Sequence, residues 1–145
     1  NVAVVHQKNQ IYGDLDVKTI VGYGRLPYLS YHQNLSEDDY QIIDWAIATT
    51  NLKEYENRLL ANLSGGQQQR VAIARSILAK PHIIFADEPT GNLDKKAGED
   101  TLNLLSSCAA RFGQTLIIVT HDLEIAKKAD RIIKIEDGKI VSNQL

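Results

Sequence analysis

Two short apolar segments constrain the fold of this chain more than any other feature. Residues 83–87 read IIFAD and residues 115–120 read TLIIVT, and a helical pattern precedes each of them. Strands that are apolar on both sides and alternate with helices are typical of a parallel sheet covered on both faces. The sequence therefore predicts an α/β fold in which both segments are buried strands of one parallel sheet.

Other patterns place further elements around that sheet. A β-branched run at residues 2–5 predicts another buried strand. One helix is expected to begin after Ser64, and another to span 95–112 and end at Gly113. Near the end of the chain RIIKI and KIVS flank EDG, which is a hairpin signal.

The segment between the first strand and Ser64 has a different character. It carries helical patterns without a strand signal, including a stretch through Tyr55, Leu59 and Leu60, and this is typical of a helical insertion. We therefore divide the chain into the end of a core strand with its following loop (1–16), a helical subdomain (17–63) and the remainder of the core (64–145).

The stretch NLSGGQQQR places two glycines at the start of a predicted helix. Ser64 and Gln67 have the spacing of a capping box, in which each side chain accepts a hydrogen bond from the backbone of the other residue. In that interpretation Gly65 and Gly66 are incidental. The alternative is a phosphate site, because a helix N-terminus offers unpaired N–H groups and glycines let an anion approach them closely.

Asp87 and Glu88 directly follow the first apolar strand. Ligands of open α/β sheets bind at the carboxyl ends of the strands. An aspartate there can hold Mg²⁺, and the glutamate beside it can act as a general base toward water. The alternative is a strand end that emerges into solvent, where acidic residues are common.

His121 follows the second apolar strand. The simplest interpretation of a lone histidine is a surface residue, here beside Asp122, which is predicted to cap the next helix. If the two apolar strands are neighbours, however, His121 becomes a candidate contact for the γ-phosphate of a nucleotide.

Four segments together, LSGGQ, IIFADEP, GNLD and IIVTH, resemble in their order and spacing the ATPase domain of ATP-binding cassette (ABC) transporters. They are similar to the family's signature motif, Walker B strand, D-loop and switch-histidine strand, and VAVVHQ is similar to the strand that leads to the Q-loop. The resemblance covers essentially the whole chain. It implies a partial P-loop NTPase-type parallel sheet, flanked by helices and carrying an inserted helical subdomain.

The resemblance also implies roles for individual residues. Glu88 would polarise the attacking water, His121 would contact the γ-phosphate of ATP, and Asp87 would hold Mg²⁺. Gln7 would sense Mg²⁺ and water, and Asp94 would contact a second ATPase domain paired head to tail with this one. The nucleotide held by that second domain would be bound in trans by Ser64, Gly65, Gly66 and Gln67.

Partners and location follow from the same resemblance. The helical subdomain would touch a transmembrane permease subunit, so the chain would lie in the cytoplasm, peripheral on the inner face of the cell membrane. Nucleic acid is not an expected partner, because the formal net charge is −2 and no global basic field exists.

The sequence lacks one motif of the family. None of its nine glycines begins the P-loop pattern G-x-x-x-x-G-K-[ST], and the only Gly-Lys pair, Gly138-Lys139, lies in the predicted hairpin. We therefore expect the chain to be the C-terminal part of a longer ATPase, without the Walker A motif. By itself it is expected to be inactive and to bind ATP weakly or not at all, because P-loop donors and the P-loop lysine hold the phosphates.

Several alternatives stay open. The front of the chain resembles iron–siderophore importer ATPases and the back resembles the lipoprotein-release and macrolide-export group, which fits either divergence or a mosaic. An iron–siderophore complex is thus one candidate cargo. Instead of hydrolysing ATP, the chain could be a non-catalytic interaction fragment that docks on a transmembrane subunit or lends its signature motif to an intact partner. A relative in DNA repair is disfavoured because no heptads of a long coiled coil are visible.

Overall fold

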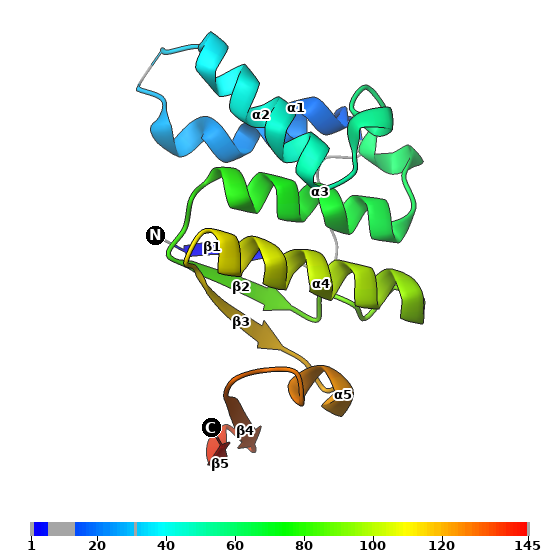
Figure 1. Cartoon of the computed structure of the whole chain (residues 1–145), viewed down its shortest axis with the longest axis vertical. Helices are drawn as coiled ribbons and strands as arrows, with labels where there is room; N and C mark the ends of the chain where they lie inside the picture. The colour runs from blue at the N-terminus through cyan, green and yellow to red at the C-terminus, as the bar shows by residue number, and fades with distance from the viewer. Residues whose placement is uncertain (1, 6–13, 31, 145) are drawn as a thin grey trace.

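The computed structural model describes residues 2–5, 14–30 and 32–144 (Figure 1). Gln7, which the sequence places in a candidate metal and water site, lies outside the described residues.

A three-stranded parallel sheet forms the centre of the fold. Its order is β1 (Val2–Val5), β2 (Ile83–Asp87) and β3 (Thr115–Val119), so β2 is the middle strand. The predicted strands and their parallel arrangement are confirmed.

Two long helices, α3 (Gly65–Leu78) and α4 (Lys95–Arg111), cover one face of this sheet (Figure 1). Both follow the predicted pattern, and α4 is followed by Gly113 at a φ of +62°, a conformation that glycine adopts without steric cost. The buried residues between helices and strands form one apolar cluster: Val5, Ala72, Ile73, Ile84, Ala86 and Leu105.

The other face of the sheet is open to solvent, which corrects the prediction of strands buried on both sides. Side chains alternate along a strand. On the two outer strands those that point away from α3 and α4 are exposed, 58% for Val2, 40% for Ile117 and 44% for Val119, whereas Ile83 and Phe85 of the middle strand are half-buried. The apolar sequence of the strands predicted elements packed on both faces of the sheet, whereas in the described part of the chain helices pack on one face only.

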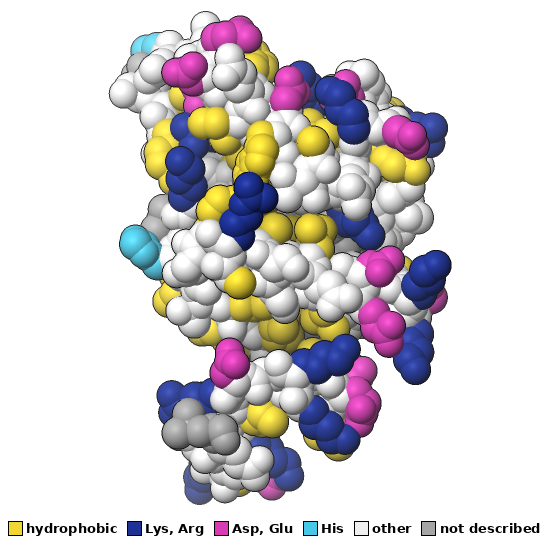
Figure 2. All heavy atoms as spheres, viewed as in Figure 1, with side chains coloured by type: hydrophobic (Ala, Val, Ile, Leu, Met, Phe, Trp, Pro, Cys, Tyr) yellow, Lys and Arg dark blue, Asp and Glu magenta, His cyan; other side chains and the backbone are white. Residues whose placement is uncertain are grey.

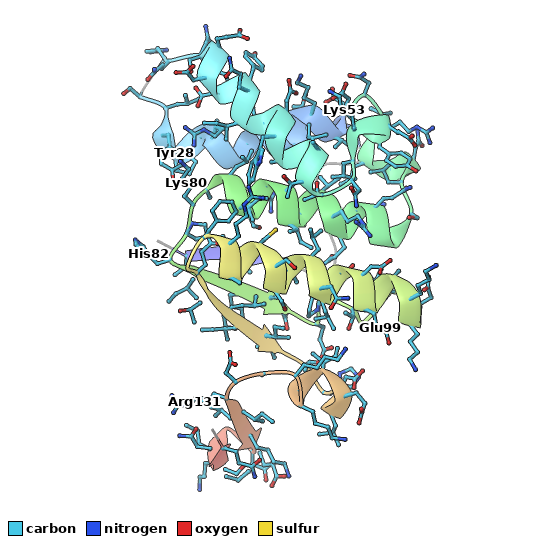
Figure 3. The ribbon with its side chains drawn as sticks, in the orientation of Figure 1. Tyr28, Lys53, Lys80, His82, Glu99 and Arg131 are labelled. Atoms are coloured by element: carbon cyan, nitrogen blue, oxygen red, sulfur yellow. The ribbon has the colours of Figure 1, made fainter. Side chains whose placement is uncertain are left out.

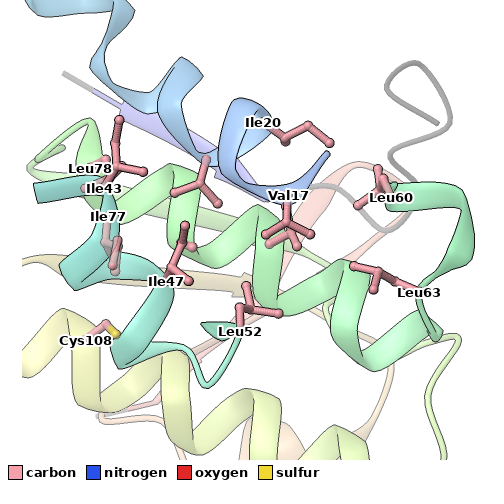
Figure 4. Packing of buried hydrophobic residues seen from close by; sticks show 14 residues of the cluster. Val17, Ile20, Ile43, Ile47, Leu52, Leu60, Leu63, Ile77, Leu78 and Cys108 are labelled. Carbon is pink, nitrogen blue, oxygen red and sulfur yellow. The ribbon is translucent and has the colours of Figure 1, made fainter. Parts of the chain in front are cut away.

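A helical layer lies on the side of α3 that faces away from the sheet (Figure 1). It contains α1 (Val17–Gly22), the 3₁₀ helix η2 (Tyr23–Tyr28) and α2 (Glu37–Thr49). Figure 4 shows the apolar side chains of α1, α2 and α3 converging between these helices. This is the larger of the two buried apolar clusters.

The start of α2 is fixed by charge as well as by capping. Ser36 and Asp39 form a complete capping box, and Arg25 Nε donates to Asp39 Oδ1 at 2.8 Å. The hydrogen bonds from Ser36, together with the Arg25 guanidinium, lower the pKa of Asp39 to about 2. Asp39 therefore stays ionised and ties η2 to α2.

The prediction of one continuous helical stretch through Tyr55 and Leu60 is wrong. The structure has two short 3₁₀ turns instead, η3 (Lys53–Tyr55) and η4 (Leu60–Asn62). The physical reason is competition for backbone groups, because the carbonyls of residues 56 and 58 accept from the N–H groups of residues 18 and 17 at the start of α1.

The 3₁₀ helix η2 lies directly on the end of α3. A Cβ built on Gly24 would be 2.3 Å from the Arg75 carbonyl oxygen, so only glycine fits this approach. The Tyr28 hydroxyl donates to the Ala79 carbonyl at 2.8 Å just beyond α3, and Figure 3 shows Tyr28 beside Lys80 at this end.

The chain continues from β3 into a short helix, α5 (Leu123–Ala126), and then into the antiparallel hairpin of β4 (Ile132–Glu136) and β5 (Lys139–Gln144). The predicted hairpin is confirmed, with Gly138 at a φ of +73° in its turn. Figure 2 shows basic and acidic side chains intermixed over the visible face of the molecule.

One aromatic contact links the helical layer to the far end of α4. Trp45 of α2 meets Phe112 edge to face, with ring centroids 5.5 Å apart, and the Arg111 guanidinium lies 5.6 Å from the Trp45 ring.

Across residues 2–5, 14–30 and 32–144, none of the helices has the length and apolar character needed to span a bilayer.

Candidate functional site

The adjacency of β2 and β3 brings two predicted site residues together. Asp87 pairs with Val119 at the carboxyl ends of these strands, and Glu88 and His121 come just after them. His121 Nδ1 lies 2.7 Å from Glu88 Oε1, and the His121 backbone N–H donates to the same oxygen at 3.0 Å. The Glu88 side chain is 24% exposed and that of His121 is 87% exposed. A largely buried carboxylate thus contacts an imidazole ring that is exposed to solvent.

Glu88 has a backbone conformation that the sequence did not reveal. Its φ is +44°, a region that costs a non-glycine residue about 1–3 kcal/mol and persists only where neighbouring contacts fix it. The Glu88 N–H donates to the Val119 carbonyl at 2.9 Å, and the Gly91 N–H donates to the Glu88 carbonyl at 3.1 Å. These bonds hold the carboxylate at the end of β3.

Thr120 is a second feature that the sequence analysis missed. Its hydroxyl lies 3.5 Å from Glu88 Oε2, and it accepts from the Asp122 N–H at 3.1 Å. The available signal was its position between a predicted strand and His121, where a small polar residue can bond to the neighbouring loop.

Asp87 is the last residue of β2 and is exposed. Its carboxylate supplies the oxygen ligands that Mg²⁺ prefers. Magnesium usually keeps several waters and is held by one or two carboxylates together with substrate phosphates. The chemistry and exposure of Asp87 fit that mode of binding.

The residues Ser64 and Gln67 form the predicted capping box at the start of α3. The Ser64 N–H donates to Gln67 Oε1 at 2.9 Å, and the Gln67 N–H donates to Ser64 Oγ at 3.3 Å. Because Ser64 Oγ is the acceptor in this bond, the hydroxyl keeps its own proton for another partner. Gly65 and Gly66 occupy the first two helical positions, where backbone N–H groups have no intrahelical acceptor.

Gly65 and Gly66 also lie beside the start of α4. A Cβ on Gly65 would be 3.5 Å from Leu93 Cδ2, and one on Gly66 would be 3.5 Å from Ala97 Cβ. These are ordinary van der Waals distances, so packing within the chain does not require glycine at either position. Asp94 caps α4, with its Oδ1 accepting from the Ala97 N–H at 2.9 Å. The start of α3 and the Asp94 loop are therefore neighbours.

The first turns of α3 and α4 lie on the right-hand side of the view in Figure 1, which is also the side to which the arrows of β2 and β3 point. Figure 3 shows Glu99, near the start of α4, on the opposite side from His82, which precedes β2. In the described part of the chain, no hydrogen bond joins residues 64–67 to Glu88 or His121. The capping-box group and the Glu88–His121 pair are thus two separate groups at one edge.

Comparison with known protein sequences points to one family. A model of the ABC transporter family matches residues 1–91. The petrobactin import ATP-binding protein FpuC of Bacillus anthracis is 36% identical over 140 residues, which cover 96% of this chain and 52% of the relative. The macrolide export ATP-binding/permease protein MacB of Haemophilus ducreyi is 55% identical over 91 residues, or 63% of this chain and 13% of the relative. The chain spans about half the length of FpuC.

Solved structures agree with this comparison. The ATP-binding cassette MJ0796, in a dimeric post-hydrolysis state bound to ADP and Pi, superposes with a TM-score of 0.81 at 34% identity. The match covers 99% of this chain and 62% of that one. Clostridium perfringens cbiO1, part of the ABC transporter complex cbiONQ, gives a TM-score of 0.84 at 28% identity over 98% of this chain and 56% of its own.

Proposed function

The chain belongs to the ABC transporter family, and from this premise we propose that it forms part of the ATP-binding and ATP-hydrolysing subunit of a membrane transporter. The observation that carries the proposal is the contact between Glu88 and His121 at the carboxyl ends of two adjacent parallel strands, with Asp87 beside it. A packing role explains this arrangement poorly, since it places two carboxylates and an exposed imidazole together at the edge where α/β folds bind ligands.

In the proposed reaction Glu88 orients and polarises the water that attacks the γ-phosphate of ATP. Its carboxylate can accept a proton from that water, and its backbone bonds to β3 and the following turn hold it in place. His121 uses Nδ1 toward Glu88, so Nε2 is the nitrogen that would face a phosphate oxygen. Phosphoryl transfer asks the protein mainly for positioning and charge neutralisation, which these two residues would supply.

Mg²⁺ and ATP are the proposed cofactor and substrate. Asp87 would hold the metal ion, with Gln7 as the second protein ligand proposed from the sequence. When bound, the ion would neutralise charge on the phosphates. The exposed position of Asp87 at the end of β2 supports its part of this assignment.

We further propose that Ser64, Gly65, Gly66 and Gln67 bind the nucleotide of a second ATPase domain. The support is that the Ser64 hydroxyl proton and the first N–H groups of α3 have no acceptor within the helix, and that packing does not require the glycines. Asp94, beside this helix start, would contact the same partner. A head-to-tail pair would unite the capping-box group of one domain with the Glu88–His121 pair of the other.

The helical region 17–63 is the proposed docking surface for a transmembrane permease subunit, which would place the chain at the inner face of the membrane. Its support is a hollow of about 350 Å³ beside α1 and α2, lined in part by Leu35 and Ile43. Leu26 and Tyr40, 55% and 44% exposed, also line it. Exposed apolar side chains at a hollow favour a protein partner.

The cargo is proposed only at the level of class. FpuC is named for petrobactin import and MacB for macrolide export. An iron–siderophore complex is our preferred candidate because the FpuC match extends over almost the whole chain, whereas the MacB match has higher identity over a shorter segment.

The test of the ATPase proposal is Glu88→Gln in the complete transporter. The amide keeps the size of the side chain but cannot accept a proton, so we expect ATP turnover to fall by about a hundredfold or more while ATP binding is retained. Turnover is measured by phosphate release and binding by retention of labelled ATP.

A matched control is Glu99→Gln, which removes an exposed carboxylate on α4 and should leave turnover unchanged. Full turnover in Glu88→Gln would contradict the proposal. A non-catalytic fragment that lends its signature motif to an intact partner predicts that Glu88→Gln has no effect while Ser64 variants do. A fragment that only docks on a transmembrane subunit predicts no effect of either change.

A further inference from the structure

Arg70 connects three helices that the proposed function assigns to different tasks. It lies in the second turn of α3, and its side chain is 22% exposed. Nη1 donates to the Thr50 carbonyl at the end of α2 at 3.4 Å, and Nη2 lies 3.9 Å from Asp100 Oδ2 on α4. A planar guanidinium with several fixed donors can serve two such partners at once.

The end of α2 needs an external donor of this kind. The Leu52 N–H donates to the Ile47 carbonyl at 2.9 Å, and the Asn51 N–H donates to the Ala48 carbonyl at 3.1 Å. With Asn51 at a φ of +56°, this is the Schellman pattern, which satisfies carbonyls inside the helix. The Thr50 carbonyl lies beyond those, and Arg70 supplies its donor while placing a positive charge at the negative end of the helix dipole.

The two contacts of Arg70 differ in how much they stabilise the packing of the helices. Thr50 is fully buried, so its hydrogen bond to a charged donor is shielded from water. Asp100 has a side chain that is 51% exposed, and an ion pair of that length and exposure contributes little. The contact with α2 is therefore the stronger of the two.

The same helix carries the capping-box group. Ser64 precedes Arg70 by six residues, or about 9 Å along the helix axis. The intervening Gly66 lies close enough to α4 that a Cβ would be 3.5 Å from that of Ala97. A shift of the end of α2 would therefore act on α3 through Arg70 and reach both Ser64 and the start of α4.

We propose that Arg70 is a positioning residue that transmits movement of the helical region 17–63 to the capping-box group and the Asp94 loop. The inference rests on the proposed function, in which region 17–63 docks on the permease and Ser64 binds nucleotide in trans.

The experiment compares ATP turnover of the complete ATPase subunit with and without its permease, for the unaltered protein and for Arg70→Gln. We expect the permease-dependent stimulation to fall at least about fivefold, the lower end of typical coupling between sites, while turnover without the permease stays near normal. Arg70→Lys keeps the positive charge but loses the planar set of donors, so we expect its stimulation by the permease to lie between those of the unaltered protein and Arg70→Gln. Asp100→Asn should have only a small effect.

A control variant, a second measurement and a substitute variant complete the experiment. Lys134→Ala removes an exposed ion pair with Glu136 on the hairpin and should leave the stimulation intact. Hydrogen exchange in Arg70→Gln should rise at the Leu52 amide and also at the Ala97 amide, whereas a purely local role would affect Leu52 alone. If Arg70→Gln does not fold, the stimulation by the permease and the hydrogen exchange of the Leu52 and Ala97 amides are measured in Arg70→Lys instead.

Unchanged stimulation, or a parallel loss of turnover with and without the permease, would overturn the inference. Glu88→Gln is measured in the same preparation, so the two proposals can fail separately. If Glu88→Gln keeps full turnover, the ATPase proposal is wrong. If it is inactive and Arg70→Gln is fully stimulated, only the role of Arg70 is wrong.

Discussion

Gly24 shows, at the scale of a single residue, how closely the helical layer lies on α3. A Cβ there would be 2.3 Å from the Arg75 carbonyl oxygen and 2.8 Å from Leu78 Cβ. The first of these neighbours is backbone and cannot rotate away. We expect Gly24→Ala to lower the free energy of unfolding by about 1–3 kcal/mol, as overpacking usually does, measured by urea denaturation.

Gly22→Ala is the matched control for that change. Its Cβ would meet the flexible end of Ile43 at 3.4 Å, which is a tolerable contact, and alanine also favours the helical backbone. Equal destabilisation by the two variants would show that loss of glycine, and not the approach to α3, is responsible.

At the scale of one element, α3 begins with a group that has two separable tasks. Ser64 caps the helix, and we propose that it also donates to a phosphate. Ser64→Ala should lower the free energy of unfolding by about 1 kcal/mol, because the cap is lost. Ser64→Asp should keep the cap, since aspartate is an equally good N-cap residue, yet abolish ATP turnover because its charge repels phosphate.

Thermal unfolding of the two Ser64 variants, with ATP turnover of the complete transporter, checks this prediction. Normal turnover in Ser64→Asp would leave the capping box as the whole explanation of the SGGQ segment. Gln68→Ala is the reference variant, because it removes the hydrogen bonds from this side chain to the Leu60 and Leu63 carbonyls and so should lower stability, while we propose no nucleotide contact for Gln68.

At the scale of the whole molecule, the nucleotide site is expected to be incomplete in these 145 residues. The P-loop pattern, whose backbone donors and lysine hold the phosphates of a nucleotide, does not occur in the sequence. We expect calorimetric titration of this polypeptide with Mg-ATP to give no measurable heat. Micromolar binding would mean that residues other than those named here hold the phosphates.

Local chemistry explains which features could be predicted. The strands, α3, α4 and the hairpin each carry a pattern that is decided within a few residues, and the neighbouring ends of β2 and β3 follow from parallel pairing. The turns near Tyr55 could not be predicted, because their backbone groups bond to α1, which is distant in sequence. The positive φ of Glu88 depends on Val119 and Gly91 in the same way. The open face of the sheet was missed because apolar composition does not show whether cover is present.

The contact between Trp45 and Phe112 gives the molecule an optical reporter of its own. Trp45 is the only tryptophan in the sequence, and it lies where α2 meets the end of α4, with the Arg111 charge near its ring. Indole emission depends on the polarity and charge around the ring. Any tilt of the helical layer away from α4 would therefore change the colour and intensity of the fluorescence, so the motion can be followed in real time without attaching a dye.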